Sequence, residues 1–194
     1  MRKYNKIFGI GPGKSGTHSL WYALDKLGIP SVHVGNLMHK CGNGFAIANK
    51  MFENRDAGRM ILDDLPIGSE WQGFDAIMDY PIGCLAKDLD RQYPGSLFIL
   101  TYRNPDDIAF SWCRMRSKFG IGDTTYKEKA EDARNRYDEM FKYFGQREDF
   151  LVLNTNEDRS ENLRTLCEFL ETTYVASDKY PHKFRSSEWY GRKR

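Results

Sequence analysis

The chain is 194 residues long, the size of one ordinary domain, and we expect residues 1–194 to fold as a single unit. Hydrophobic residues make up 40% of the composition and charged residues 29%, which excludes a disordered or fibrous protein. The formal net charge of +2 excludes a global basic field, so we expect neither nucleic acid nor an anionic membrane as the main partner.

Neither a membrane span nor a secretory signal is predicted. Nowhere do about 18 apolar residues run together, as a transmembrane helix requires. The start of the chain is basic, but the apolar run that follows it ends at Gly9, which is too short for a signal peptide. We therefore expect a cytoplasmic protein.

The first part of the chain is predicted to run from a strand through a glycine loop into a helix. Residues 6–10 form a short apolar run that Gly11-Pro12-Gly13 interrupts. Apolar residues then recur at helical spacing as far as Gly28, a typical helix stop. Residues 31–34 are predicted to form a second short strand. From 36 to 74 the periodicity is weak, and no regular element is predicted.

Strands and helices continue to alternate in the rest of the chain. The clearest strand, at 96–102, is nearly continuous apolar sequence, as expected for a strand covered on both faces of a parallel sheet. Asn104 then provides an N-cap and Pro105 a first helical position. The other predicted elements are strands at 75–79 and 150–153 and helices at 85–93, 126–144 and 163–170. This alternation predicts an α/β fold with a parallel sheet and right-handed crossovers.

Residues 11–18, between the first strand and the first helix, have the composition of an anion-binding loop. Glycines let the backbone approach a phosphate, and the following helix presents N–H groups and the positive end of its dipole. Lys14 adds a charge, and Ser15 and Thr17 add hydroxyl donors. The alternative is a glycine turn whose lysine points to water. Because Lys14 precedes Gly16 instead of following it, the loop differs from that of ordinary ATPases.

A second anion site is predicted where the strand at 96–102 ends. Arg103 directly follows this strand, at the edge where open α/β sheets bind ligands. Ser111 falls in the second turn of the next helix, so both side chains could reach one anion near the helix start. On the residues alone, Arg103 could also be a surface residue and Ser111 a neutral helix position.

Taken together, the two segments resemble the sulfotransferase family. Lys14-Ser15-Gly16-Thr17 followed by Ser19-Leu20 is similar to the family's 5′-phosphosulfate motif. Residues 102–111 resemble its 3′-phosphate motif, with an Arg and a Ser at the same spacing. The resemblance implies a three-layer α/β/α fold with a central parallel sheet, like that of P-loop nucleoside-triphosphate hydrolases. It also implies the donor 3′-phosphoadenosine 5′-phosphosulfate, the product 3′,5′-adenosine bisphosphate and no metal.

The resemblance further implies roles for individual residues. Lys14 is implied to stabilise the leaving group as the sulfonate departs, and Arg103 and Ser111 to bind the 3′-phosphate. Phe184-Arg185 resembles the basic and aromatic segment that closes over the nucleotide, although the usual glycine pattern of that segment is missing. The implied donor-binding residues are therefore Gly13, Lys14, Ser15, Gly16, Thr17, His18, Arg103, Ser111 and Arg185.

Sulfonate transfer also needs a base that removes the proton of the acceptor. Asp79, with Pro81 soon after it, lies where the small-molecule sulfotransferases carry a catalytic His, and this context resembles a bacterial branch of the family. Other branches use a carboxylate after the second strand, where this chain has His33. A His has a pKa of about 6.5 and needs little adjustment, whereas an Asp needs burial to raise its pKa. We rank Asp79 first, but the two could form an oriented pair, and both could instead be structural.

The acceptor is expected to be a hydroxyl or amine on a small molecule or a glycan. Residues 36–74 and the loop at 120–122 fit the regular architecture least well, so we expect acceptor recognition there. Two other functions remain open: a P-loop kinase acting on a small molecule, and a noncatalytic nucleotide-binding protein that kept the pocket and lost the base.

Overall fold

The computed structural model describes residues 4–40, 45–66, 73–120, 125–174 and 180–181, with the backbone alone at 38–40 and 119. Within these residues, five strands form one sheet in the order β2-β3-β1-β4-β5, and every neighbouring pair is parallel. The strands are β1 (Ile7–Gly9), β2 (Ser31–His33), β3 (Ala76–Met78), β4 (Leu97–Tyr102) and β5 (Phe150–Asn154). The predicted α/β fold with a central parallel sheet is confirmed.

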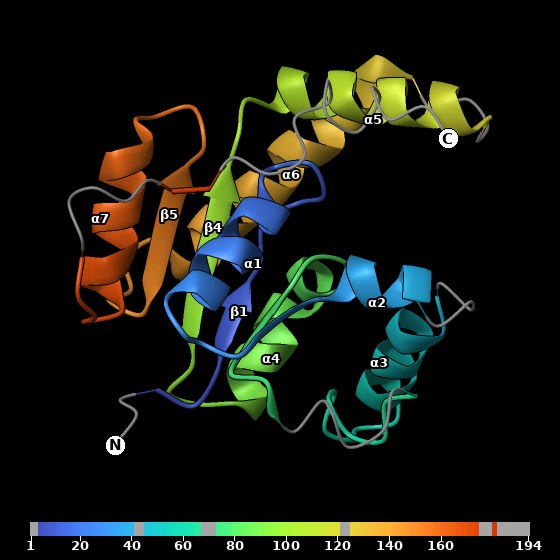
Figure 1. Cartoon of the computed structure of the whole chain (residues 1–194). Coiled ribbons are helices and arrows are strands. Elements are labelled where there is room, and N and C mark those ends of the chain that lie inside the picture. The colour runs from blue at the N-terminus through green and yellow to red at the C-terminus, as the bar shows by residue number, and fades with distance from the viewer. Residues whose placement is uncertain (1–3, 41–44, 67–72, 121–124, 175–179, 182–194) are drawn as a thin grey trace.

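Helices cover both faces of this sheet, and Figure 1 shows α1 in front of it and α6 behind it. The helical elements are α1 (Thr17–Lys26), α2 (Val34–Lys40), α3 (Ala46–Asp56), the 3-10 turn η2 (Ile82–Leu85), α4 (Ala86–Gln92), α5 (Pro105–Phe119), α6 (Tyr126–Phe144) and α7 (Arg159–Phe169). Because alternate residues of a strand face opposite sides, the core divides in two. Ile7 and Ile99 pack with α1 and α7, whereas Phe8 and Phe98 pack with α4 and α6. No described helix is long and apolar enough to cross a membrane.

Capping residues define the helix starts that the sequence predicts. The Asn104 side chain accepts a hydrogen bond from the N–H of Asp106 at 2.8 Å, and Pro105 occupies the first helical position of α5. At the start of α6, Thr125 and Glu128 form a capping box, in which each side chain accepts from the other residue's backbone N–H. The helix predicted at 85–93 differs slightly, because it begins earlier as η2.

Residues 36–74 contain most of α2 and all of α3, neither of which the weak periodicity predicts. The inner face of α3 buries Ile47 and Met51, but it also buries the polar Asn54. The Asn54 side-chain amide donates to the carbonyl of Asp63 at 2.7 Å. A buried polar residue with backbone partners interrupts the apolar stripe of a helix, so the sequence pattern does not show this helix face.

The carboxyl ends of the strands meet at one edge of the sheet. The register places His33 beside Met78, and Met78 beside Gly9. The segments that leave β1, β2 and β3 therefore start side by side, and Arg103 and Thr155 follow β4 and β5 at the same edge. This is the edge at which open α/β sheets bind ligands.

Candidate functional site

Ser15 closes the loop between β1 and α1. Its N–H and its hydroxyl both donate to the carbonyl of Pro12, at 3.1 and 2.7 Å. Since a hydroxyl has one proton, the hydroxyl of Thr101 on β4 donates in turn to Ser15 Oγ, at 2.6 Å. A Cβ added at Gly11 would collide with both hydroxyl groups. The loop is therefore fixed to the end of β4, and only glycine fits at position 11.

The N-terminus of α1 follows this loop without a side-chain cap. Its N-cap residue is Gly16, at a φ of 114°, and no acidic residue lies in the first turn. Lys14 also has a positive φ, 73°, a conformation that costs a non-glycine residue free energy and is common in functional loops. An uncapped helix start offers N–H groups and a positive dipole end to an anion. The start of α1 can therefore bind an anion such as a phosphate.

Lys14 supplies the full positive charge of the loop. Its ammonium lies 5.7 Å from the centre of the Trp112 ring, and the Trp112 indole N–H donates to the carbonyl of Gly13 at 3.2 Å. Burial lowers the pKa of Lys14, an effect that Asp79 opposes and Arg103 strengthens. A bound anion would favour the charged form of Lys14, so this lysine suits a negatively charged ligand.

Thr17, His33 and Asp79 form a polar chain next to the loop. Thr17 Oγ1 lies 3.0 Å from His33 Nε2, and His33 Nδ1 lies 3.5 Å from Asp79 Oδ2. The side chain of His33 is 2% exposed and that of Asp79 is 17% exposed. Asp79 is therefore the more accessible of the two predicted base candidates, and His33 lies behind it.

Asp79 is confined by its own backbone and by α2. Its φ is 79°, and the backbone N–H groups of Tyr80 and Gly35 donate to its carboxylate. A Cβ on Gly35 would lie 2.5 Å from Asp79 Oδ2. Burial raises the pKa of Asp79 above its ordinary value, although these hydrogen bonds and nearby Lys14 act in the opposite direction. A confined carboxylate with a raised pKa is suited to accept a proton.

His18 packs against this polar chain as a neutral ring. Its ring centre lies 3.6 Å from that of His33, and its Nε2 lies 2.9 Å from the side-chain oxygen of Asn36. Burial, and then the neighbouring His33, lowers the pKa of His18 to about 4. The ring therefore carries no charge at neutral pH, and with Asn36 as acceptor its Nε2 carries the proton.

Arg103 and Ser111 lie at the start of α5, on the other side of the loop. The Arg103 guanidinium donates through Nη1 to the carbonyl of Lys14 at 3.2 Å, and its Nε lies 3.9 Å from the Asp107 carboxylate. Ser111 is half-buried in the second turn of α5. The structure thus brings Arg103 to the Lys14 loop, while the Arg103 side chain remains 35% exposed to solvent.

Some contacts of the site have no signal in the sequence. Asn36 lies in the segment where no element is predicted, and its position three residues after His33 is the one feature of the sequence that relates it to the site. In the sequence, Tyr137 occupies an apolar position of the helix predicted at 126–144. In the structure, its hydroxyl accepts a hydrogen bond from the backbone N–H of Arg103 at 3.0 Å. The predicted Arg185 lies outside the described residues, as does most of the loop at 120–122.

The groups at the carboxyl ends of the strands can together bind an anion and accept a proton. It offers an uncapped helix start, the cations Lys14 and Arg103, and a confined carboxylate at Asp79. Among the residues with described side chains, no group of three or more His, Cys, Asp and Glu is arranged to hold a metal ion. These groups can position a substrate with two phosphate-like parts and take a proton from a second substrate.

Comparison with protein families gives one match, to a sulfotransferase domain over residues 6–124, more than half of the chain. This span contains the Lys14 loop, His33, Asp79 and the segment from Arg103 to Ser111. The sequence matches no curated protein.

Solved structures similar to this chain include several bacterial sulfotransferases. The sulfotransferase of Alicyclobacillus acidocaldarius is 17% identical, with 97% of this chain and 90% of that chain covered at a TM-score of 0.60. The sulfotransferase domain of the Synechococcus PCC 7002 olefin synthase is 15% identical, with 90% and 76% covered at a TM-score of 0.59. Sulfotransferase STF9 of Mycobacterium avium is 14% identical, with 91% and 66% covered at a TM-score of 0.53. At these identities the likeness shows the fold.

Proposed function

This chain belongs to the sulfotransferase family and is an enzyme that transfers a sulfonate group, and on that premise we propose that its donor is 3′-phosphoadenosine 5′-phosphosulfate. The acceptor in this proposal is a hydroxyl or an amine on a small molecule or glycan. The proposal takes residues 1–194 as one domain, which is supported by the position of both halves of the site on the same sheet.

The contact between Arg103 and the Lys14 loop is the observation that carries the proposal. A donor with both a 5′-phosphosulfate and a 3′-phosphate needs two anion sites within one nucleotide's reach. The 3.2 Å hydrogen bond from the Arg103 guanidinium to the Lys14 carbonyl supports such a pair of sites. Arg103 and Ser111 bind the 3′-phosphate, and charge-assisted hydrogen bonds of this kind are strong.

The 5′-phosphosulfate is held by the loop and by the start of α1. Ser15 uses its N–H and its hydroxyl to close the loop, so its role is to shape the site. Backbone N–H groups from Gly16 to His18 face the anion in this proposal, and Gly13 leaves space for the indole of Trp112. Arg185 remains a proposed contact with the nucleotide.

Asp79 acts as the base, and His33 supports it from behind. The donor supplies a sulfonate on a phosphate leaving group. Asp79 accepts the proton of the acceptor hydroxyl while the acceptor oxygen forms a bond to sulfur. The bond between sulfur and the bridging oxygen breaks, its electron pair stays on the 5′-phosphate, and the Lys14 ammonium stabilises that developing charge. The greater exposure of Asp79, 17% against 2% for His33, supports this division of roles.

Calorimetry with 3′,5′-adenosine bisphosphate and with AMP tests the proposal. The wild type is expected to prefer the bisphosphate, and Arg103→Ala to weaken its binding by about 10–100-fold while AMP binding stays unchanged, because only the bisphosphate has the 3′-phosphate.

Arg164→Ala serves as the matched control, since Arg164 on α7 is also a partly exposed, ion-paired arginine. It is expected to bind both nucleotides like the wild type. Equal affinity of the wild type for the two nucleotides would contradict the proposed donor. Magnesium-dependent turnover of ATP would instead favour a small-molecule kinase.

A further inference from the structure

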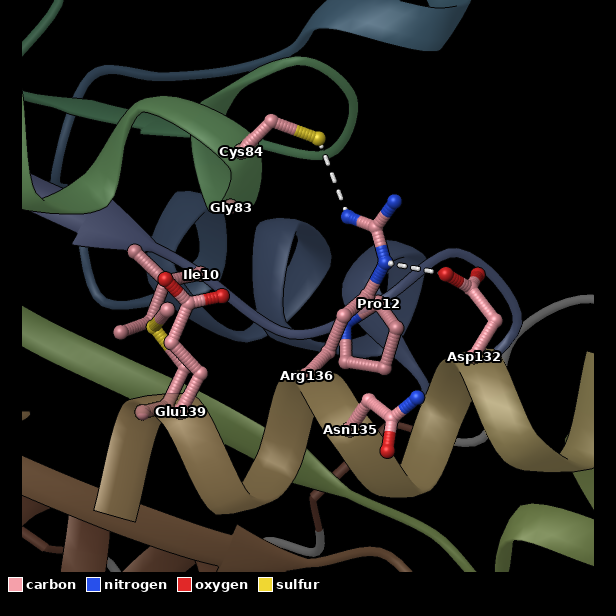
Figure 2. Close-up of a pocket in the computed structure, with 9 residues that line it drawn as sticks. Ile10, Pro12, Gly83, Cys84, Asp132, Asn135, Arg136 and Glu139 are labelled. Atoms are coloured by element: carbon pink, nitrogen blue, oxygen red, sulfur yellow. Dashed lines mark hydrogen bonds and ion pairs between the residues drawn. The ribbon is translucent and has the colours of Figure 1, made fainter. Parts of the chain in front are cut away.

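A cavity of about 310 Å³ lies between the loop after β1, the turn η2 and helix α6. Figure 2 shows Asp132, Asn135, Arg136 and Glu139 rising from α6 on one side of this cavity and Cys84 facing them from the other. Ile10, Pro12 and Met140 add an apolar part to the lining. The volume is at the small end of ligand pockets, which measure roughly 300–1,000 Å³.

The α6 side of the cavity is polar but nearly neutral. Arg136 Nε donates to Asp132 Oδ1 at 3.2 Å, and Arg136 Nη1 lies 3.0 Å from the Cys84 sulfur. The ammonium of Lys87 lies 2.7 Å from Glu139 Oε1. Two carboxylates are therefore balanced by a guanidinium and an ammonium, so the cavity offers hydrogen-bond donors and acceptors without a net charge.

The cavity adjoins the segments that carry Lys14 and Asp79. Pro12 in its lining lies two residues before Lys14, and Cys84 lies five residues after Asp79. These segments are packed closely, because a Cβ on Gly83 would lie 2.7 Å from the carbonyl oxygen of Ile10. A molecule in the cavity would therefore lie beside both the loop and the turn that follows the proposed base.

We propose that this cavity is the acceptor subsite and that it takes a neutral, polyhydroxylated ring of about monosaccharide size. This inference rests on the proposed function. Hydroxyl groups both donate and accept, so they can pair with Glu139, Asn135 and Arg136 at once. Ile10, Pro12 and Met140 can pack against the C–H face of the ring. Asp79 does not line the cavity, so the assignment requires that a hydroxyl of the ring extends from the cavity toward Asp79. That hydroxyl gives its proton to Asp79, and its oxygen takes the sulfonate as the donor's bridging bond breaks.

The same lining disfavours an apolar or strongly charged acceptor. The side chains of Asp132, Asn135 and Glu139 are exposed, and a phenol or a steroid would cover them without replacing the hydrogen bonds that they make to water, which is costly. An acceptor with a net charge would find no unbalanced opposite charge among the described residues that line the cavity. Specificity for hydroxyl groups follows from the hydrogen bonds that the site needs to make.

Ligand-observed NMR on the full chain, saturated with 3′,5′-adenosine bisphosphate, tests this assignment. The probes are myo-inositol and the methyl glycosides of glucose, galactose and mannose, with phenol for comparison. At least one polyol is expected to bind more tightly than phenol. Asn135→Ala and Glu139→Ala are each expected to weaken that binding by about tenfold, the effect of a lost hydrogen bond or two.

Glu131→Ala is the matched control, because Glu131 is also exposed on α6 but does not line the cavity. It is expected to bind the polyol like the wild type. Tighter binding of phenol, no binding of any polyol, or equal polyol binding by all three variants would overturn the acceptor assignment. Preference for the bisphosphate over AMP, measured on nucleotide-free portions of the same protein preparations, separates these failures from failure of the proposed function.

Discussion

The two halves of the proposed site differ in their exposure to solvent. The half at the ends of β2 and β3 contains His33 and Asp79, with side chains 2% and 17% exposed. The half at the start of α5 contains Arg103, 35% exposed and held by one hydrogen bond at 3.2 Å and an ion pair at 3.9 Å. The first half is mostly buried, and the second half is open to solvent.

From this difference we expect the buried half to serve the chemical step and the open half to serve nucleotide binding. In the buried half, low solvent access shifts the pKa of Asp79 upward and the pKa of His18 downward, and it strengthens electrostatic effects on a reacting group. In the open half, water screens the charges, so in the proposed function Arg103 contributes mainly to nucleotide affinity and to selection for the 3′-phosphate. Changes in the buried half should therefore affect kcat, and changes in the open half should affect nucleotide binding.

Asp79→Asn should have the largest effect and should act on kcat alone. We expect kcat to fall by about 10²–10⁴-fold, the usual contribution of a general base, with unchanged affinity for 3′,5′-adenosine bisphosphate. Asparagine tolerates the φ of 79° at this position, so the fold should be retained. Steady-state kinetics and calorimetry on the same preparation measure the two quantities.

Asp64→Asn provides the matched control for this variant. Asp64 is an exposed aspartate that also has a positive φ, 49°. It should retain wild-type kcat. If Asp79→Asn kept more than a tenth of the wild-type kcat, Asp79 would not be the base.

Gly35→Ala should disturb the buried half without removing a polar group. The new Cβ would lie 2.5 Å from Asp79 Oδ2, so the carboxylate must move. A displacement of this kind can cost about 10²-fold in kcat, although alanine is favoured over glycine within a helix such as α2. Gly73→Ala is the control, because a Cβ there meets no atom of the described residues within 4 Å. Equal kcat for both variants would argue against a confined base.

The pH dependence of kcat/KM should show the smallest of these effects on activity, about tenfold per pH unit on the acid side. Asp79 accepts a proton only when it is ionised, and burial raises its pKa. Activity should therefore fall as the pH falls through this raised pKa, and Asp79→Asn should lose that limb of the profile. A wild-type profile that bends only at the ordinary pKa of an exposed aspartate would contradict the burial argument.

The same pKa shift affects stability with a defined sign. The pKa of Asp79 is higher in the folded state than in the unfolded state, so the folded state holds this proton more tightly. Its contribution to the free energy of unfolding is fully present below the unfolded pKa and is lost as the pH rises through the folded pKa. Thermal unfolding at several pH values should therefore show a smaller loss toward high pH in Asp79→Asn than in the wild type.

Local patterns in the sequence predicted the strands, most helices and the residues at the strand ends. The apolar run at 96–102, the N-cap at Asn104 and the glycines around Lys14 each depend on neighbouring residues, so they can be read along the chain. The α2 and α3 helices could not be read in this way. The buried Asn54 is satisfied by the carbonyl of Asp63, a contact that no periodicity reveals.

The sequence by itself determined the family, the parallel α/β fold and the position of the Lys14 loop, because these depend on short motifs and on the alternation of elements. Only the tertiary structure decided which residues face one another. It placed His33 behind Asp79, joined Arg103 to the Lys14 carbonyl and opened a cavity against α6. These relations set burial, and burial sets the pKa of Asp79, because desolvation depends on all surrounding atoms rather than on neighbours along the chain.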